Sequence, residues 1–433
     1  MSPDALASAG NAFEASLDAY FASGLDDADR DVAALIRAEG DRQSRNIELI
    51  ASENVVSRAV LGAQGSWFCN KTVEGYPGAR YHGGADVADA LETLGERRAR
   101  ALFRAKQANL QPHSGSQANL AVFSALLKPF DPVLALDLKC GGHLSHGSKA
   151  NISGKIYDMH AYGLHPDDGR IDMDQVRDAA RQHRPKLIVA GGSSYPRELD
   201  LKAFREIADS VDARLLVDMA HFAGLVAGDV LGNPVDHADV VTTTTYKSLR
   251  GARGGMILWN DERLSRPLRS AVFPGVQGSP LLHMMAAKAV GLGEARRPTF
   301  KDYARRVRAN ARALADEMMS RGMNVVTDGT DTPLVLVDLT DLETDGQTAC
   351  DALAAIGITC NKNLIANDPQ PPSTTSGLRF GVSAMTSRGI VEAEIRRVGR
   401  WIADCLLGRM ADPGRVRQEV ERMARSFRFY PVS

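Results

Sequence analysis

Five short apolar runs in the middle of the chain constrain its fold more than any other feature. They are "DPVLALDL" (131–138), "PKLIVAGGS" (185–193), "ARLLVDMAH" (213–221), "ADVVTTTTY" (238–246) and "GGMILWN" (254–260), and helical stretches such as "LKAFREIADSV" (201–211) separate them. Nearly continuous apolar strands that alternate with helices are typical of a mostly parallel sheet covered on both faces. We therefore predict an α/β fold built on residues from about 107 to 290.

The sequence on either side of this region has a different pattern. Residues 1 to about 48 are rich in Ala, Asp and Glu, with apolar residues at helical spacing and no strand-like run, which predicts an N-terminal helical arm. After about residue 295, a long helical stretch is followed by short strand-like runs, which predicts a smaller C-terminal α+β domain. We divide the chain into an arm at 1–50, a large domain at 51–297 and a small domain at 298–433.

Composition argues against several functional classes. The 433 residues include 52 Lys and Arg against 53 Asp and Glu, so no overall field favours nucleic acid or an anionic membrane. Five scattered cysteines without a C-x-x-C pair argue against a disulfide framework and a zinc site. Because the sequence shows neither a leader-like start nor a run of about eighteen apolar residues, we expect a cytoplasmic protein. Its expected partners are small molecules or copies of the same chain.

The stretch "TTTTYKSLRG" (242–251) places Lys247 just after a threonine run with strand character. A lysine at the end of a buried strand costs free energy unless its amine is used. Ligands of α/β proteins gather at the carboxyl ends of strands, so Lys247 lies where a ligand would bind. Lys247 is therefore a candidate catalytic residue.

Three further polar segments lie near strand ends. Asp218 ends the run at 213–221, where a carboxylate either caps a helix or serves a ligand. The turn at 114–116 opens a helical stretch and suits a phosphate, although taken alone a plain helix cap explains it better. His143 and His146 lie in the glycine-rich loop "CGGHLSHGS", but no third ligand follows at metal spacing, so we predict no metal site.

Together these segments indicate one cofactor. A phosphate cradle, a buried carboxylate, a loop histidine and a strand-end lysine are the parts that hold pyridoxal 5'-phosphate. The lysine forms a Schiff base, and the carboxylate keeps the ring nitrogen protonated so that the ring accepts electrons. The combination is more specific than any one member, and it predicts a pyridoxal-phosphate enzyme.

A series of sequence blocks then resembles a known family. The blocks are "RNIELIASEN", "EGYPGARYHGG", "QPHSGSQAN", "GGHLSHGSKANISGKIY", "VDMAHFAGLVA", "TTTTYKSLRGARGG", "FPGVQGSP", "NKNLIANDP" and "TSGLRFGVSAMTSRG". They resemble, in order, the signature blocks of the serine hydroxymethyltransferases from about residue 35 onward. The resemblance implies the aspartate-aminotransferase-like fold of type I pyridoxal-phosphate enzymes, with a seven-stranded sheet. It also implies a homodimer whose active sites share residues.

The resemblance implies roles for residues of the cofactor site. Lys247 matches the Schiff-base lysine, Asp218 the partner of the pyridinium nitrogen, and His143 the imidazole stacked on the ring. His221 matches the residue beside the phenolic oxygen of the ring. The other expected cofactor contacts are Ser114, Gly115, Ser116, Ser193, Thr244 and Gly278 of the partner subunit.

The resemblance also implies how substrates bind. Arg379 in "SGLRFG" matches the arginine whose planar fork binds the substrate carboxylate. Glu74 in "VEGYPG" matches the acid–base carboxylate that handles the substrate hydroxyl. In the family, tetrahydrofolate captures the one-carbon unit that Cα–Cβ cleavage releases. The other expected substrate contacts are Ser52, Thr72, Tyr81 and His82, and the expected folate contacts are Leu138, Leu144, Tyr81 and Asn363.

Three positions depart from the family pattern. Members normally read "NKYxEGYPGxRYYGG", whereas Thr72 and His82 here replace two tyrosines. Tyr246 stands where histidine usually precedes the lysine, and drift or a compensated exchange explains this difference equally well. A ring removed from a lined pocket leaves a void that destabilises the protein or is filled by ligand. A larger group on Cα fills it, so we expect α-methylserine as substrate and D-alanine as product, as in the α-methylserine hydroxymethyltransferase branch.

Other functions stay open. An ordinary serine hydroxymethyltransferase and a folate-independent α-methylserine aldolase are the alternatives within this chemistry. A cofactor-binding regulator or a catalytically silent partner is disfavoured because Lys247, Asp218 and Arg379 are intact and no basic DNA-binding helix pair is appended. A generic aminotransferase is disfavoured because it would have no use for Glu74 and the folate contacts.

Overall fold

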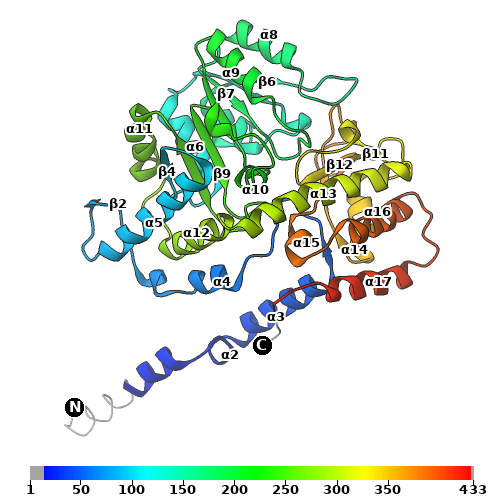
Figure 1. Cartoon of the computed structure of the whole chain (residues 1–433), viewed down its shortest axis with the longest axis horizontal. Coiled ribbons are helices and arrows are strands. Elements are labelled where there is room, and N and C mark those ends of the chain that lie inside the picture. Colours follow the sequence, from blue (N-terminus) through cyan, green and yellow to red (C-terminus); the bar gives the residue numbers. More distant parts are fainter. Residues whose placement is uncertain (1–13, 431–433) are drawn as a thin grey trace.

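The computed structural model describes residues 14–430, and a seven-stranded sheet forms its centre (Figure 1). The strands pair in the order β4-β10-β9-β8-β7-β5-β6, parallel from β9 to β6, while β10 is antiparallel to both neighbours. The predicted mostly parallel α/β sheet is thereby confirmed. The strands are β4 (Gln107–Asn109), β5 (Pro132–Leu136), β6 (Asp158–Tyr162), β7 (Leu187–Ala190), β8 (Arg214–Asp218), β9 (Val240–Thr244) and β10 (Gly255–Trp259).

The central strands form because mostly apolar or β-branched side chains are buried on both of their faces. Every residue of β7, β9 and β10 is buried, as is all of β8 except Arg214. Asp218 and Thr242 are paired in register, so β8 and β9 end side by side. The helices of this part of the chain are α5 (Asp86–Phe103), α6 (Gly115–Leu126), α7 (Ile152–Ile156), α8 (Met173–His183), α9 (Leu201–Ser210), α10 (Ala223–Ala227), α11 (Ser265–Ser270) and α12 (Leu282–Ala295).

A second, smaller sheet follows the long helix α13 (Pro298–Ser320). Its four strands are antiparallel in the order β11-β12-β15-β14, which agrees with the α+β pattern predicted there. The proposed domain boundary at 297 falls between α12 and α13, and the division into domains stays a prediction. The further elements are β11 (Asn324–Val325), β12 (Leu334–Asp338), β13 (Ile358–Thr359), β14 (Asn361–Asn363), β15 (Gly377–Gly381), α14 (Gly346–Ala355), α15 (Ser383–Arg388), α16 (Glu392–Leu406) and α17 (Pro413–Ser426).

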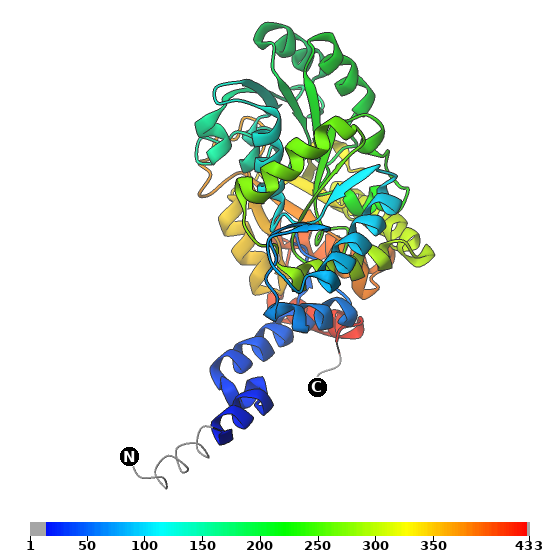
Figure 2. The ribbon, with the colours of Figure 1, turned by 90° about the vertical axis from the view of Figure 1, so that its left-hand side faces the viewer.

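The N-terminal region extends away from the body of the molecule (Figures 1 and 2). Residues 14–22 are helical and are followed by α2 (Leu25–Ala28) and α3 (Arg30–Arg45), while residues 1–13 of the predicted arm lie outside the described residues. The expectation of no strand in this region is wrong. β1 (Ile47–Glu48) pairs in parallel with β13, because backbone hydrogen bonds join it to a segment far along the chain.

Two short elements connect the arm to the large sheet. Helix α4 (Arg58–Gln64) begins at Ser57, whose hydroxyl accepts a hydrogen bond from the Val60 N–H, and the hairpin β2 (Gly75–Tyr76) and β3 (Ala79–Arg80) follows it. Among residues 14–430, no helix is long and apolar enough to cross a bilayer. Over the same range, no group of three His, Cys, Asp or Glu side chains is arranged to hold a metal ion.

Candidate active site

The carboxyl end of β9 carries the buried amine of Lys247. Its Nζ lies 2.9 Å from Nε2 of His221, and both side chains are buried. Burial lowers the pKa of Lys247 to about 8 and the pKa of His221 well below its usual value. A larger share of this amine is therefore uncharged at neutral pH than in an exposed lysine, which suits a nucleophile.

The backbone around Lys247 is held from both halves of the chain. The Asn54 side chain donates to the Lys247 carbonyl over 2.8 Å, and the Ser387 hydroxyl donates to Asn54 over 2.6 Å. The Tyr303 hydroxyl, on α13, donates to the next carbonyl, that of Ser248, over 3.1 Å. The turn that carries the amine is thus fixed by residues far away in the sequence, and a local sequence pattern does not reveal these contacts.

Asp218 lies in a buried polar network at the end of β8. Its Oδ2 accepts from Nδ2 of Asn119 over 2.8 Å and lies 3.0 Å from Nε2 of His146, while its Oδ1 accepts from the Ala220 N–H over 3.0 Å. Burial by itself raises the pKa of Asp218, but the hydrogen bonds from His146 and Asn119 hold it well below its usual range. A carboxylate that stays ionised can keep a bound pyridine nitrogen protonated.

The loop between β5 and β6 positions His143. Nδ1 of His143 lies 2.7 Å from the Ser145 hydroxyl and accepts from the Ser145 N–H over 3.1 Å. Burial lowers the pKa of His143 to about 4, so the ring is neutral at physiological pH. Asn119 also donates to Ser145 over 3.0 Å, which couples this loop to the carboxylate network.

The start of α6 offers a site for an anion. The Ser114 hydroxyl caps the helix by accepting from the Gln117 N–H over 3.1 Å, and Ser114 and Ser116 are both exposed. A Cβ on Gly115 would lie 2.7 Å from Cγ2 of Thr244, so a side chain there would collide with β9. Free N–H groups at a helix start, beside hydroxyls and a glycine that admits close approach, suit a phosphate.

Arg379, in β15, connects the small sheet to this site. Its Nη1 donates to the Ser193 carbonyl and its Nε to Oδ1 of Asn361 over 3.1 Å, while the Ser193 hydroxyl donates to the Gly142 carbonyl over 2.7 Å. Burial lowers the pKa of Arg379 to about 10, so it stays charged at neutral pH. Two donors hold the guanidinium in place, and its other donors remain for a ligand.

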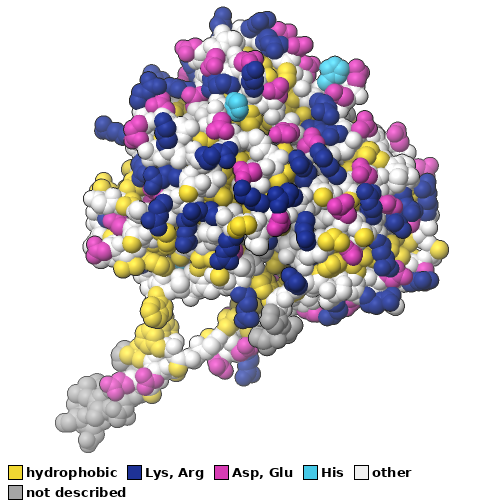
Figure 3. Space-filling model, in the orientation of Figure 1, with side chains coloured by type: hydrophobic (Ala, Val, Ile, Leu, Met, Phe, Trp, Pro, Cys, Tyr) yellow, Lys and Arg dark blue, Asp and Glu magenta, His cyan; other side chains and the backbone are white. Residues whose placement is uncertain are grey.

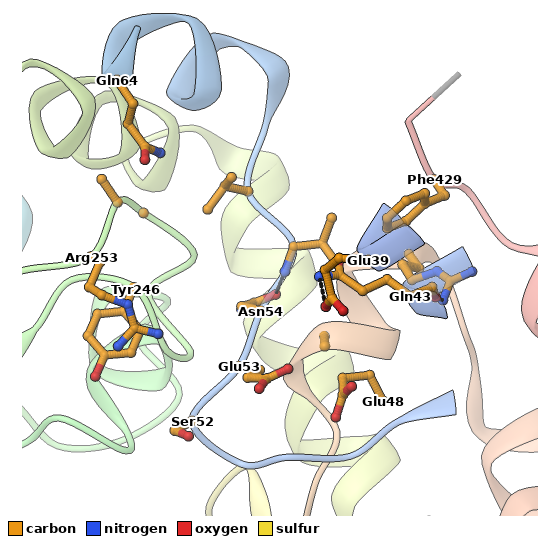
Figure 4. A pocket seen from close by; sticks show the side chains of 16 residues that line it. Glu39, Gln43, Glu48, Ser52, Glu53, Asn54, Gln64, Tyr246, Arg253 and Phe429 are labelled. Atoms are coloured by element: carbon orange, nitrogen blue, oxygen red, sulfur yellow. Dashed lines mark hydrogen bonds between the residues drawn. The ribbon is translucent and has the colours of Figure 1, made fainter. Parts of the chain in front are cut away.

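Ser52 lines a neighbouring pocket of about 330 Å³ (Figure 4). Glu53, Asn54, Tyr246 and Arg253 also line this pocket. The guanidinium carbon of Arg253 lies 4.1 Å from the centroid of the Tyr246 ring. The tyrosine that departs from the family pattern thus packs against an arginine.

None of the remaining predicted residues forms a hydrogen bond with Lys247 within the part of the chain that the structure describes. Thr72, Tyr81 and His82 are exposed on and beside the β2–β3 hairpin. A Cβ on Gly278 would lie 3.3 Å from Oε1 of Glu74, so these two lie together. The expected folate contacts Leu138 and Leu144 are exposed, and Asn363 bonds to the Leu364 carbonyl over 2.6 Å.

Part of this site was not predicted from the sequence. Asn119, Ser145 and Thr242 were not singled out, and His146 was considered only as a metal ligand. The Thr242 hydroxyl donates to Oδ1 of Asn119 over 2.6 Å, which fixes the amide so that its nitrogen faces Asp218. Thr242 lies within the threonine run at 242–245. A hydroxyl inside a fully buried strand needs a hydrogen-bond partner, and this requirement could have pointed to the network.

The residues present fit pyridoxal phosphate. The site combines a buried lysine amine of lowered pKa, an ionised carboxylate, a neutral histidine and a helix start suited to phosphate. These are the groups that such a cofactor needs for covalent attachment, ring-nitrogen contact, ring stacking and phosphate binding. The donor set of the site therefore agrees with the cofactor that the sequence predicted.

Comparison with known proteins identifies the family. The family model described as serine hydroxymethyltransferase matches residues 25–402. Proteins named serine hydroxymethyltransferase from Hyphomonas neptunium and Zymomonas mobilis are each 53% identical to this chain, over 416 and 420 residues. These matches cover 95% of this chain and 96% and 98% of the relatives. A protein of the same name from a Methylobacterium species is 51% identical over 431 residues, or 98% of this chain and all of the relative. The chain belongs to the serine hydroxymethyltransferase family.

Proposed function

We propose that this enzyme transfers the hydroxymethyl group of serine to tetrahydrofolate, giving glycine and methylenetetrahydrofolate, with pyridoxal phosphate as cofactor. The observation that carries the proposal is the buried pair of Lys247 and His221, 2.9 Å apart, where the charges of Asp218 and Arg379 both act on the Lys247 amine. The names of the relatives support serine as the substrate rather than α-methylserine, which the sequence analysis preferred.

The chain's own residues divide the work as follows. Lys247 would hold the cofactor covalently, Asp218 would contact its ring nitrogen, and the start of α6 would bind its phosphate. When bound, pyridoxal phosphate supplies an electron sink for a bond broken at Cα. His143, neutral because of its lowered pKa, can lie against the ring without adding a charge.

Substrate orientation falls to Arg379. Two of its donors are used by Ser193 and Asn361, so the guanidinium is fixed before the carboxylate arrives. A carboxylate held in this way would orient the substrate, so that Cα–Cβ is the bond of serine placed for cleavage. Glu74 would take the hydroxyl proton as the formaldehyde unit leaves.

Glu74 would reach this site from a second subunit. Among residues 14–430, no hydrogen bond or ion pair joins the hairpin segment at 72–82 to Lys247, and Trp67 and Tyr81 expose 91% and 77% of their surface. Exposed aromatic side chains of this size are typical of protein interfaces. Tyr20 and Phe21 of the arm are also exposed, and Figure 3 shows hydrophobic side chains along the arm. We therefore propose a homodimer with shared active sites.

Mixing two inactive variants tests the shared site. Lys247→Ala and Glu74→Gln each remove activity, but a mixed dimer contains one site in which both native residues meet. Refolding the two together should restore roughly a quarter of wild-type activity, because half of the dimers are mixed and half of their sites are intact. A mixture that stays inactive would place Glu74 and Lys247 in the same subunit's site.

Folate dependence tests the transfer step. With Leu138, Leu144 and Asn363 as the expected contacts, tetrahydrofolate should speed release of the one-carbon unit from serine. The measurement is the rate of glycine formation with and without tetrahydrofolate at fixed serine. A rate independent of tetrahydrofolate would make the protein a simple aldolase.

A second candidate function is cleavage of α-methylserine to D-alanine. The observation that favours it is the replacement of two family tyrosines by Thr72 and His82 in the segment proposed to enter the partner's site. Removing those rings leaves room for a methyl group on Cα. Discrimination by one methyl group is worth about 1–3 kcal/mol, so the preference would be roughly ten- to two-hundredfold.

The ratio of kcat/KM for serine to kcat/KM for α-methylserine separates the two candidates. A ratio well above one supports the proposed serine activity, and a ratio below one supports α-methylserine. In the second case Thr72→Tyr combined with His82→Tyr should move the ratio toward serine, since neighbouring residues of one pocket act together. Leu281→Ala, at an exposed side chain outside the segment at 72–82, is the matched control and should leave the ratio unchanged.

A further inference from the structure

Lys288 is a buried lysine that the proposed mechanism does not use. It lies on α12 with 3% of its surface exposed. Its Nζ donates to three backbone carbonyls, those of Leu110 over 2.7 Å, Pro112 over 2.9 Å and Gly255 over 3.1 Å. An ammonium has three donors and no acceptor, so all of them are engaged.

The three carbonyls belong to the backbone directly behind the start of α6. Leu110 and Pro112 lead into the Ser114 turn, and the Gly255 N–H donates to the Pro112 carbonyl over 3.0 Å. A Cβ on Gly255 would lie 2.2 Å from the Ser114 carbonyl oxygen, and a Cβ on Gly254 would lie 2.0 Å from Cε of Lys288. The ammonium, the first residues of β10 and the turn are therefore in close contact.

This arrangement has an electrostatic consequence. Three carbonyl oxygens converge in a dry interior, and their partial negative charges repel one another unless a donor lies between them. Burial nonetheless lowers the pKa of Lys288 to about 7, although the charge of Glu92 opposes that shift. A phosphate dianion at the turn favours the protonated amine, because an opposite charge stabilises the charged form of a buried group.

We propose that Lys288 is a positioning residue for phosphate: it holds the Ser114 turn from behind and supplies a buried positive charge to the phosphate bound there. This inference rests on the proposed pyridoxal-phosphate binding and adds a residue to that site. Lys288 acts through the backbone of the turn and does not take part in bond breaking at Cα.

Comparison of two ligands tests the proposal. Pyridoxal 5'-phosphate and pyridoxal share the ring and the aldehyde, and only the first carries phosphate. In full-length protein freed of cofactor, Lys288→Met should lower the affinity for pyridoxal phosphate roughly ten- to a hundredfold. This range is typical when a residue is removed that positions a ligand-binding group, as measured for the residues behind metal ligands. Pyridoxal affinity should change by less than threefold. Absorbance titration gives both dissociation constants.

Lys301→Met is the matched control. Lys301 is an exposed lysine on α13 that pairs with Asp229 over 2.6 Å, so its loss removes one charge without touching the turn. It should leave both affinities unchanged. Equal weakening of pyridoxal phosphate and pyridoxal by Lys288→Met would assign Lys288 a purely structural role and overturn the inference. Absence of pyridoxal-phosphate binding by the wild type would instead overturn the proposed function and this inference with it.

A measurement on the wild type covers the case in which Lys288→Met does not fold. The phosphate group is almost fully ionised above pH 7, so its own titration no longer changes affinity there. If Lys288 binds a proton more tightly in the complex, the ratio of pyridoxal-phosphate to pyridoxal affinity falls as pH rises from 7 to 9. The titratable and charged groups around it are Glu92 and Arg98 on α5 and His113 before α6, and burial lowers the pKa of His113. A ratio that does not change with pH would contradict the proposal.

Discussion

Replacing Arg379 with lysine removes the planar fork that we assign to the substrate carboxylate. The native guanidinium already donates to Ser193 and Asn361, and lysine has only three donors. A lysine that satisfied both acceptors would keep one hydrogen for substrate, so at least one charge-assisted hydrogen bond is lost. Such a bond contributes about 1.5–3 kcal/mol, and with imperfect replacement of the buried contacts the total is about 2–4 kcal/mol. Amino-acid affinity should therefore fall about thirty- to several-hundredfold.

Serine and glycine binding can be followed by absorbance titration of the cofactor-loaded variant. Pyridoxal-phosphate affinity should stay within about threefold of wild type, since Arg379 is assigned to the substrate. Arg388→Lys is the control: this buried arginine donates to the Gln43 and Ala424 carbonyls, so its replacement should lower thermal stability without changing serine affinity. Unchanged serine affinity in Arg379→Lys would show that the carboxylate binds elsewhere.

Three other measurements address separate features. Borohydride treatment should fix the pyridoxyl group to Lys247, located by peptide mass spectrometry, and a label on another lysine would refute the assignment. The pKa of Asp218 is held below its unfolded value near 3.9, so its contribution to stability is present above that pH and lost as pH falls; Asp218→Asn should flatten the acid side of a plot of unfolding free energy against pH. Sγ of Cys350 lies 3.7 Å from Sγ of Cys360, so hydrogen peroxide should remove two titratable thiols in the wild type but not in Cys360→Ser.

The fold was predictable where buried strands are apolar in sequence. All five apolar runs are strands of the large sheet, because central strands are apolar on both faces. The two strands at the edges of that sheet were missed. β4 is three residues long with the sequence "QAN", and β6, "DMHAY", is buried only at its last residue. An edge strand has one neighbour, so pairing rather than apolar content defines it.

The candidate site was predictable where a charged side chain stands at the end of an apolar strand. Asp218 ends β8 and Lys247 comes shortly after β9, its parallel neighbour, so their proximity follows from the sheet. Contacts between distant segments could not be predicted from residue periodicity. Asn119 reaches Asp218 from α6, and Arg379 reaches Ser193 from the second sheet. The place of the segment at 72–82 in the active site could not be assigned for another reason. We propose that this segment contacts a second subunit, and a single chain does not contain that subunit.

The pairing of β1 with β13 has a consequence for synthesis on the ribosome. Ile47 is matched to Ile358, and Ser52 and Asn54 of the site follow directly after β1. At a rate of about 5–20 residues per second, the strand emerges roughly 15–60 s before its partner exists. During that interval the apolar side chains of Ile47 and Leu49, fully buried in the finished protein, have no native cover. The first strand of this chain therefore stays without its native partner until about five-sixths of the message has been translated.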